Sequence, residues 1–228
     1  MKVSMRVGAA LMLLGLVQAS GALAGEKEIQ KARDAVVVLD EIMRAPDQSV
    51  PASLLRDAYA VAVIPNVVKA GFVVGGRGGK GLISVKTANG TWSNPSYLKL
   101  AGASVGFQAG VQATDVVLVF RSKKGVDTIV NGKVTLGGDM SVAAGPVGRT
   151  AQASTDGHFK AEIYSYSRAR GLFAGVALDG AIISIDHRAN QSIYGRNTTP
   201  RAIFEGRVNM PPGEIVDLRD RLEEYSAR

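Results

Sequence analysis

Apolar residues recur at helical spacing near both ends of the chain. In residues 26–44 they fall three or four positions apart on one face, at Ile29, Ala32, Val36, Leu39 and Met43. The other face mixes acids and bases, whereas a helix on a lipid surface is usually rich in Lys and Arg. Pro212–Arg228 repeats the pattern with Ile215, Leu218, Leu222 and Tyr225. We predict two amphipathic helices that pack on a core, and shorter helices over residues 53–59, 124–130 and 189–194.

Between the two amphipathic segments the pattern is that of short strands. Runs rich in Val, Ile, Leu and Phe are bounded by Gly, Asn or Pro, at Ala60–Ile64, Gly71–Gly75, Gly81–Lys86, Ala101–Gln112, Asp115–Arg121, Lys133–Leu136, Ala161–Tyr166, Phe173–Leu178 and Ala181–Asp186. We expect Pro65-Asn66 to end the first run, and Asp179-Gly180 to join the last two as a hairpin. Strands and helices do not alternate regularly, which argues against a parallel doubly wound sheet. The predicted fold class is α+β, with a mostly antiparallel curled sheet or barrel-like core and N- and C-terminal amphipathic helices packed on it.

Residues Ala101–Gln112 have an unusual alternation. The odd positions are Ala, Val or Phe, and most even positions are Gly or Ser. A strand would place these sets on opposite faces, one of them almost without side chains. Such a face allows close packing inside the domain or against an acyl chain.

The first residues have the pattern of a secretory signal. Lys2 and Arg6 precede the apolar run Val7–Val17, and Ala22-Leu23-Ala24 is a small-x-small cleavage site. We predict a signal peptide over residues 1–24 and one domain over residues 25–228; an uncleaved N-terminal anchor is the alternative. The expected location is the periplasm, with peripheral attachment to a membrane.

The chain is basic and has no cysteine. Its formal net charge is +7, or +5 without Lys2 and Arg6 of the predicted signal peptide. After a secretory signal, basic charge indicates anionic lipid, anionic glycan or acidic protein partners more than nucleic acid. The lack of cysteine excludes disulfides, zinc-thiolate sites and thiol nucleophiles.

A glycine-dense stretch, Lys69–Gly81, contains Gly75, Gly76, Gly78, Gly79 and Gly81 and carries Arg77 and Lys80. We interpret it as a loop in which two cations could hold a phosphate, or as a tight turn alone. It matches the GxGxxG spacing of dinucleotide sites, but a strand-like run follows where those sites have a helix. It also lacks the first glycine and the Ser or Thr of a P-loop.

Candidate catalytic residues are few. His158 and His187 have no second histidine or cysteine at metal-ligand spacing. Asp115 and Asp139 could contribute to a calcium site, although such sites gather several oxygen ligands. We therefore expect no enzyme activity, no cofactor and no metal site built on histidine.

Eight short blocks in register give the chain a resemblance to the SYLF domain family. They are KAGF at 69–72, GRGG at 76–79, WS-x-PS at 92–96, TD at 114–115, LGG at 136–138, SVA-x-GP-x-GR at 141–149, YSYS at 164–167 and RGLFAG at 170–175. The resemblance covers residues 52–206. It implies non-enzymatic binding of anionic lipids, which in eukaryotic members include phosphoinositides, and in some members an association with actin. Those members are thought to bind lipid largely through a basic N-terminal segment, which the mixed-charge helix replaces here. In a bacterial envelope, phosphatidylglycerol, cardiolipin or lipopolysaccharide phosphates would be the substitutes.

The predicted lipid site consists of basic residues from three turn-rich segments, together with the loop glycines Gly76, Gly78 and Gly79. The cations are Lys69, Arg77, Lys80, Arg149, Arg168 and Arg170. We expect the three segments to meet at one rim of the curled sheet. The alternative is that these cations pair internally with Asp115, Asp139 or Glu162. A second hypothesis for function is an envelope structural or stress-response protein that binds another envelope protein through an apolar patch.

Overall fold

A computed structural model describes residues 25–45, 49–71, 74–105, 110–147, 161–169, 172–175 and 178–227. The predicted signal peptide lies outside these residues, as do His158 and two of the predicted site residues, Arg149 and Arg170.

The predicted helices are confirmed. An N-terminal helix covers residues 25–44, and the others are α2 (Ala52–Arg56), α3 (Lys123–Asn131), α5 (His187–Tyr194), α6 (Pro200–Phe204) and α7 (Gly213–Ser226). Side chains of Ser122, Asp186 and Thr199 accept hydrogen bonds from the first turns of α3, α5 and α6. Helix α6 was not predicted, although Thr199-Pro200 is a typical helix start.

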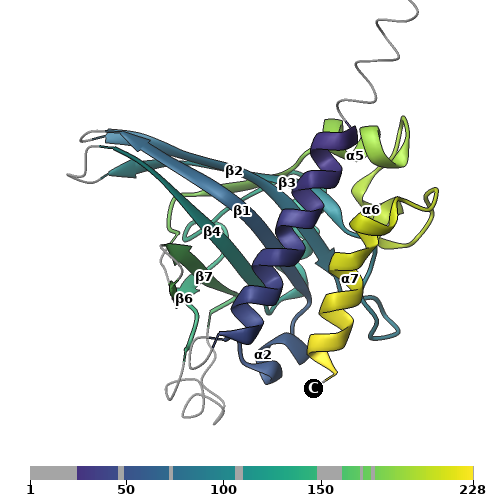
Figure 1. The fold of residues 1–228 in the computed structure, drawn as a ribbon, viewed down its shortest axis with the longest axis horizontal. Coiled ribbons are helices and arrows are strands. Elements are labelled where there is room, and N and C mark those ends of the chain that lie inside the picture. Colours follow the sequence, from purple (N-terminus) through teal and green to yellow (C-terminus); the bar gives the residue numbers. More distant parts are fainter. Residues whose placement is uncertain are drawn as a thin grey trace, which may run out of the picture.

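The strands form a mostly antiparallel curled sheet (Figure 1). They are β1 (Ala60–Gly71), β2 (Val74–Val85), β3 (Ser96–Val105), β4 (Gly110–Phe120), β5 (Lys133–Thr135), β6 (Val142–Ala144), β7 (Ile163–Ala169), β8 (Leu172–Gly175) and β9 (Ile182–Ile185). The order is β5-β9-β3-β2-β1-β4-β7-β6, with β8 paired to β7. The β6–β7 pair is parallel and the other pairs are antiparallel. This architecture confirms the predicted α+β class with a curled sheet.

The prediction that Pro65-Asn66 ends a strand is wrong, because β1 continues to Gly71. The pairing of β1 with both neighbours shifts at this point, and Asn66 has a φ of 53°. Its backbone N–H donates to Oδ1 of Asp115 at 2.9 Å. Since a proline cannot donate to a ladder, Pro65 is accommodated at the irregularity instead of terminating the strand.

The described part of the glycine-dense stretch is strand and not loop. Gly75 to Gly81 lie within β2, between β1 and β3. A Cβ atom at Gly81 would collide with the carbonyl of Val63, and one at Gly79 would lie 2.9 Å from Cγ2 of Val67. Glycine is therefore required here because the irregular part of β1 passes very close to β2.

Two further strand predictions are wrong. Ala101–Gln112 is divided between β3, which ends at Val105, and β4, which begins at Gly110. Asp179-Gly180 is a turn, with a φ of 75° at Gly180, but it does not form a hairpin between β8 and β9. Strand β8 pairs with β7, whereas β9 pairs with β3 and β5. The position of the turn was predicted correctly, but β8 and β9 pair with other strands of the sheet and not with each other.

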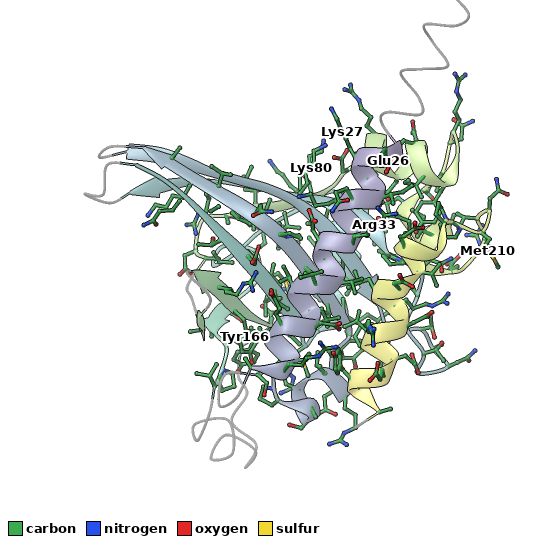
Figure 2. All side chains as sticks on the ribbon, viewed as in Figure 1. Glu26, Lys27, Arg33, Lys80, Tyr166 and Met210 are labelled. Carbon is green, nitrogen blue, oxygen red and sulfur yellow. The ribbon has the colours of Figure 1, made fainter. Side chains whose placement is uncertain are left out.

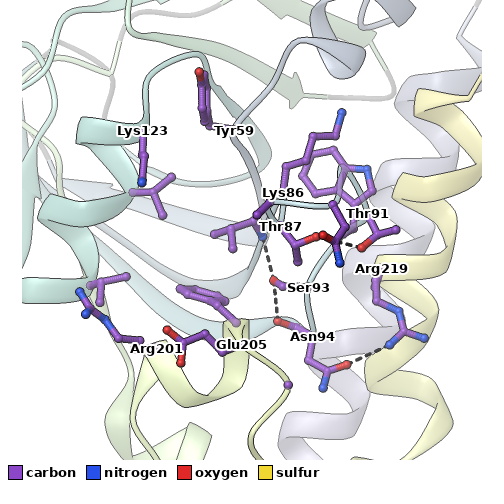
Figure 3. A pocket seen from close by; sticks show the side chains of 18 of the residues that line it. Tyr59, Lys86, Thr87, Thr91, Ser93, Asn94, Lys123, Arg201, Glu205 and Arg219 are labelled. Atoms are coloured by element: carbon purple, nitrogen blue, oxygen red, sulfur yellow. Dashed lines mark hydrogen bonds between the residues drawn. The ribbon is translucent and has the colours of Figure 1, made fainter.

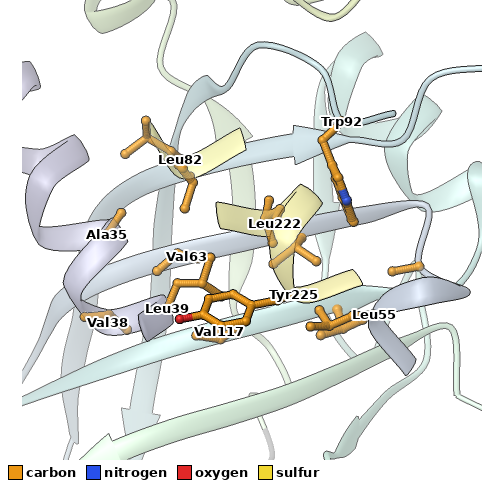
Figure 4. Close-up of a cluster of buried hydrophobic side chains, with 14 of the residues drawn as sticks. Ala35, Val38, Leu39, Leu55, Val63, Leu82, Trp92, Val117, Leu222 and Tyr225 are labelled. Atoms are coloured by element: carbon orange, nitrogen blue, oxygen red, sulfur yellow. The ribbon is translucent and has the colours of Figure 1, made fainter. Parts of the chain in front are cut away.

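Buried apolar side chains lie on both faces of the sheet. On one face, which we call the helix face, the N-terminal helix and α7 lie on β1, β2 and β4 (Figures 1 and 4). Its buried residues include Ala35, Leu39, Val63, Leu82, Val117, Leu222 and Tyr225. On the opposite face, α3, β5 and β9 enclose a second cluster that includes Ile64, Ile83, Leu98, Leu118, Phe120, Ile129 and Ile183. The alternation along each strand separates these two sets.

The central strands continue beyond the helices as a narrower extension, seen at the upper left of Figure 1. We call it the sheet arm and define it as residues 67–71, 74–79, 101–105 and 110–114 of β1 to β4. Pairing persists to its end, where Gly71 lies opposite Gly75 and Gly110, and Val74 opposite Val105. On the helix face of the arm, Val68, Ala70, Ala101 and Ala103 are exposed.

Candidate functional site

The central strands come from a part of the chain that has no acidic residue. From Ala58 to Thr114 there is no Asp or Glu, whereas Lys69, Arg77, Lys80, Lys86 and Lys99 all fall in this stretch. Any neutralisation of these cations must come from other segments. In the structure, Lys69 and Arg77 form one group, Lys80 and Lys99 form a second, and Lys86 lies apart from both, beside Trp92.

The first group is a cross-strand pair on the sheet arm. Lys69 of β1 lies directly opposite Arg77 of β2, so both side chains are on the same face, the one opposite the helices. Lys69 forms no ion pair or hydrogen bond with the residues that the structure describes, and Nη2 of Arg77 donates to the carbonyl of Asp179 at 3.2 Å. Like charges directly opposite each other destabilise a sheet. An anion bound between them would relieve that repulsion.

The second group contains Lys80, which is on the helix face, because three positions separate it from Arg77 along the strand. Its Nζ lies 2.9 Å from Oδ2 of Asp186, and Nζ of Lys99 lies 3.4 Å from Oδ1. In the view of Figure 2, the Lys80 label lies toward the end of the molecule where the N-terminal helix begins. Lys80 and Lys99 thus compensate a carboxylate that is only 1% exposed.

Asp186 explains why two lysines meet there. Burial alone would raise the pKa of its carboxyl group, but the hydrogen bonds from Lys80 and from the Ala189 N–H, with the charges of Lys80 and Lys99, outweigh burial and lower that pKa. The same carboxylate caps α5 through the Ala189 N–H. Lys80 therefore has a structural partner.

Arg168 is also neutralised within the fold. Its Nη2 and Nε lie 2.7 and 2.9 Å from Oδ2 of Asp115, and Nη1 contacts Glu41 of the N-terminal helix. This is the internal pairing that the sequence left open as an alternative. Asp115 uses both oxygens within the fold, one for Arg168 and one for the Asn66 N–H.

Of the six predicted cations, the structure describes Lys69, Arg77, Lys80 and Arg168, and these four do not share one surface. The structure brings Lys69 and Arg77 together but places Lys80 on the other face and binds Arg168 to two carboxylates. Of the predicted loop glycines, Gly76 and Gly78 are on the helix face of β2, the same face as Lys80. Added Cβ atoms at these two positions would make only ordinary contacts, at 3.9 and 3.7 Å. Gly79 faces Ile64 and Val67 on the opposite face, where it serves close packing.

A second basic feature, which the sequence did not reveal, is at the other end of β2 and β3 (Figure 3). A hollow of about 880 Å³ lies between the turn after β2, α3, α6 and Arg219 of α7. Lys86, Lys123, Arg201 and Arg219 line it, together with Asp127 and Glu205. The chain's single tryptophan, Trp92, also lies here, with Nζ of Lys86 at 5.3 Å from its ring centroid. A lone Trp close to a Lys in an acid-free stretch was the available sequence signal.

Within the described ranges, His, Asp and Glu do not gather in groups of three or more that could hold a metal ion. In the same ranges, no helix has the length and apolar character needed to cross a bilayer. His187 is exposed at the start of α5.

The fold and these surfaces define a class: an α+β protein with helices on a curled antiparallel sheet, a basic sheet arm and a basic hollow. Residues 101–225 match the family model described as "Ysc84: Las17-binding protein actin regulator". The chain belongs to this family, the SYLF or Ysc84 family, as its motifs indicated.

Relatives in fungi and animals support this membership. The chain is 43% identical over 178 residues to Protein YSC84 of Saccharomyces cerevisiae, which covers 76% of this chain and 37% of that protein. It is 40% identical over 184 residues to LAS seventeen-binding protein 3 of the same yeast (79% and 39%). It is 31% identical over 206 residues to the human SH3 domain-containing YSC84-like protein 1 (89% and 60%). The chain thus spans between about two fifths and three fifths of the length of these relatives.

Proposed function

We propose that this protein is a non-enzymatic binding domain for anionic phospholipid surfaces and that the sheet arm makes the contact. The observation that carries the proposal is the Lys69–Arg77 pair, two cations held opposite each other with no carboxylate partner among the described residues. Phosphate groups in a headgroup layer would supply the missing counter-charge.

The arm's two faces suit the boundary between headgroups and acyl chains. One face exposes the small apolar side chains of Val68, Ala70, Ala101 and Ala103. The other carries Lys69 and Arg77, whose long side chains can reach phosphates while their stems stay near the sheet. Glycine and alanine keep both faces slim, which favours entry of the arm into a headgroup layer.

The expected affinity is modest. Each cation near an anionic surface contributes on the order of 1 kcal/mol, and the effect weakens as salt screens the charges. Phosphatidylglycerol, cardiolipin and lipopolysaccharide phosphates are the proposed ligands, because the predicted signal peptide would deliver the protein to a bacterial envelope.

A flotation assay tests this proposal. The protein is mixed with vesicles of phosphatidylcholine alone or with phosphatidylglycerol, at low and at high salt. We expect it to float with the phosphatidylglycerol vesicles at low salt, and Lys69→Ala/Arg77→Ala to reduce the bound fraction severalfold. The matched control is Lys124→Ala/Lys133→Ala, which removes the same charge from exposed positions on α3 and β5.

Equal binding by the arm variant and the control variant would exclude the arm as the contact. Equal binding of the unmodified protein to both kinds of vesicle would refute recognition of anionic lipid. Lys80 is left unchanged in this test, because its removal would leave the buried Asp186 carboxylate without its closest cation and would destabilise the fold.

A protein partner is the second candidate function, and the relatives' names favour it. One relative is named for binding Las17, and the family model is described as an actin regulator. The proposed partner here would be an envelope protein that contacts an apolar patch. A contact of that kind should persist at high salt, whereas lipid-phosphate binding should not.

A further inference from the structure

The basic hollow at the end of β2 continues into a second one. The smaller hollow, of about 500 Å³, is lined by Arg56, Asp57 and Arg121, and it shares Tyr59, Lys86 and Thr87 with the larger one. Together they form an elongated depression from α2 to α6, which we call the basic groove. Its combined volume exceeds that of a small-molecule site and suits an extended segment.

Charge in the basic groove is unbalanced. Arg56, Lys86, Lys123 and Arg201 line it without an ion pair to any carboxylate in the described part of the chain. Arg219 is paired with Asp220, and Glu205 with Arg207, so each is already compensated. The acids that remain to offset the four cations are Asp57 and Asp127. The groove is therefore complementary to an anionic ligand.

The rest of the lining suits a peptide. Val85, Val126, Val130 and Phe204 give the groove apolar surface, and Tyr59 is 47% exposed at the junction of the two hollows. Exposed Tyr and Arg are the residues that most often anchor protein contacts. Thr87, Asn89, Thr91 and Asn94 supply hydrogen-bonding groups that could meet a peptide backbone.

The position of the groove separates it from the sheet arm. Strands rise about 3.3 Å per residue, so Arg77 on the arm and Lys86 in the groove lie about 30 Å apart along β2. Figure 1 shows the arm at the far end of the sheet from α2 and the C-terminus. A membrane touched by the arm would leave the groove facing away from it. If the arm makes the membrane contact, as proposed above, a protein segment in solution is the favoured occupant of the groove.

We infer that the basic groove binds an acidic peptide segment with interspersed aromatic or aliphatic residues, supplied by a partner protein. Carboxylates would meet Lys123 and Arg201 across the larger hollow and Arg56 beyond Tyr59. The apolar side chains of the peptide would cover Phe204 and Val126. The residues of this site are distinct from those of the arm, and only the preference for a peptide over lipid rests on the proposed function.

Trp92 provides a reporter at the site, because the chain has no other tryptophan. Its ring contacts Lys86, so an anion that draws Lys86 away changes the field at the indole. Tryptophan emission is followed while the protein is titrated with a random copolymer of glutamate and tyrosine, excited where tyrosine does not absorb. The copolymer presents many local spacings of acid and ring, so a failure to bind counts against the inference.

We expect a saturable change in Trp92 emission, and Lys123→Ala/Arg201→Ala to weaken binding about tenfold. Both residues are exposed, and Lys123→Glu alone serves as a second variant with a reversed charge. The matched control is Lys124→Ala/Arg196→Ala, which removes the same charge from exposed residues outside the groove and should bind like the unmodified protein. Melting temperatures confirm that each variant is folded.

Four outcomes would overturn the inference: no response to the copolymer, equal weakening in the control variant, unchanged binding in the groove variants, or equal binding of a lysine–tyrosine copolymer. Phosphatidylglycerol vesicles and inorganic phosphate are titrated in parallel. A change in Trp92 emission with either of these but not with the acidic copolymer would make the groove a phosphate or lipid site, and the peptide inference would be wrong.

Discussion

At the scale of single residues, the buried carboxylate of Asp186 shows why Lys80 of the glycine-dense stretch is not available to a ligand. Asp186 is almost fully buried, caps α5 and lies within 3.4 Å of Nζ of both Lys80 and Lys99. Lys80 and Lys99 are themselves about half exposed. A cation that looks available in the sequence is thus committed to holding α5 against β2 and β3.

Asp186→Asn should lower the free energy of unfolding by about 1–3 kcal/mol at neutral pH, the usual loss for a hydrogen bond to a charged group. The amide keeps the cap but loses the charge. Because the pKa of Asp186 is lowered in the folded protein, its stabilisation is complete above the unfolded pKa, about 3.9, and disappears as pH falls through the lower folded value. Thermal unfolding from pH 7 to pH 2 should show the deficit of the variant shrinking at acid pH.

The control for this measurement is Asp217→Asn, an exposed carboxylate on α7. It should change the free energy of unfolding by no more than an ordinary surface substitution does, about 0.5 kcal/mol. A deficit for Asp186→Asn that stays constant down to pH 2 would contradict the ion-pair account.

At the scale of elements, the glycines of β2 have different purposes. Gly81 lies where the irregular part of β1 crosses, and an added Cβ would be 2.7 Å from Cα of Ile64. Gly78 points to the other face, where an added Cβ would be 3.7 Å from the carbonyl of Leu100. A side chain therefore has no room at Gly81 but has room at Gly78.

Gly81→Ala should therefore destabilise the protein by about 1–3 kcal/mol or more, the cost of overpacking against backbone that cannot move aside. Gly78→Ala should be close to neutral, and by limiting the unfolded chain it could stabilise slightly. Chemical denaturation of both variants checks this. Similar stability of the two would mean that β1 and β2 are not in contact as the structure shows them.

These elements also mark how far the sequence alone could lead. The amphipathic helices were predictable, because Ile215, Leu218, Leu222 and Tyr225 of α7 are all buried at helical spacing. The strand through Pro65-Asn66 was not, because its irregularity depends on Asp115, distant in sequence, accepting the Asn66 N–H. The glycines of β2 looked like a loop because the sequence does not show the close approach of β1 that requires glycine at Gly79 and Gly81.

At the scale of the whole molecule, pairing across the fold separates the four predicted cations that the structure describes. Lys69 and Arg77 could be recognised as neighbours only from the β1–β2 register, and Arg168 could be discounted only once Asp115 and Glu41 were in place. The basic groove combines α2, α3, α6 and the turn after β2, which no local motif links. The result is a molecule with one basic surface at each end of its central strands.

The N-terminal helix bears on whether membrane binding uses the arm or a released helix. Its apolar residues Ala32, Ala35, Val38, Leu39 and Ile42 are all buried against the sheet and α7. Asp40 accepts a hydrogen bond from Tyr225 at 2.8 Å, and Arg33 pairs with Glu214 at 2.8 Å. The face that could enter a bilayer is therefore occupied within the fold.

Tyr225→Phe removes one bond that holds this helix, at an expected cost of about 1–3 kcal/mol, and leaves the helix sequence unchanged. If vesicle binding required the helix to leave the core, weaker docking would raise the released population and tighten binding, about tenfold for each 1.4 kcal/mol. If the arm makes the contact, flotation with phosphatidylglycerol vesicles should be unchanged while the melting temperature falls. Tyr59→Phe, at a ring that is 47% exposed, controls for loss of a hydroxyl. Tighter binding by Tyr225→Phe alone would move the membrane contact from the arm to the N-terminal helix.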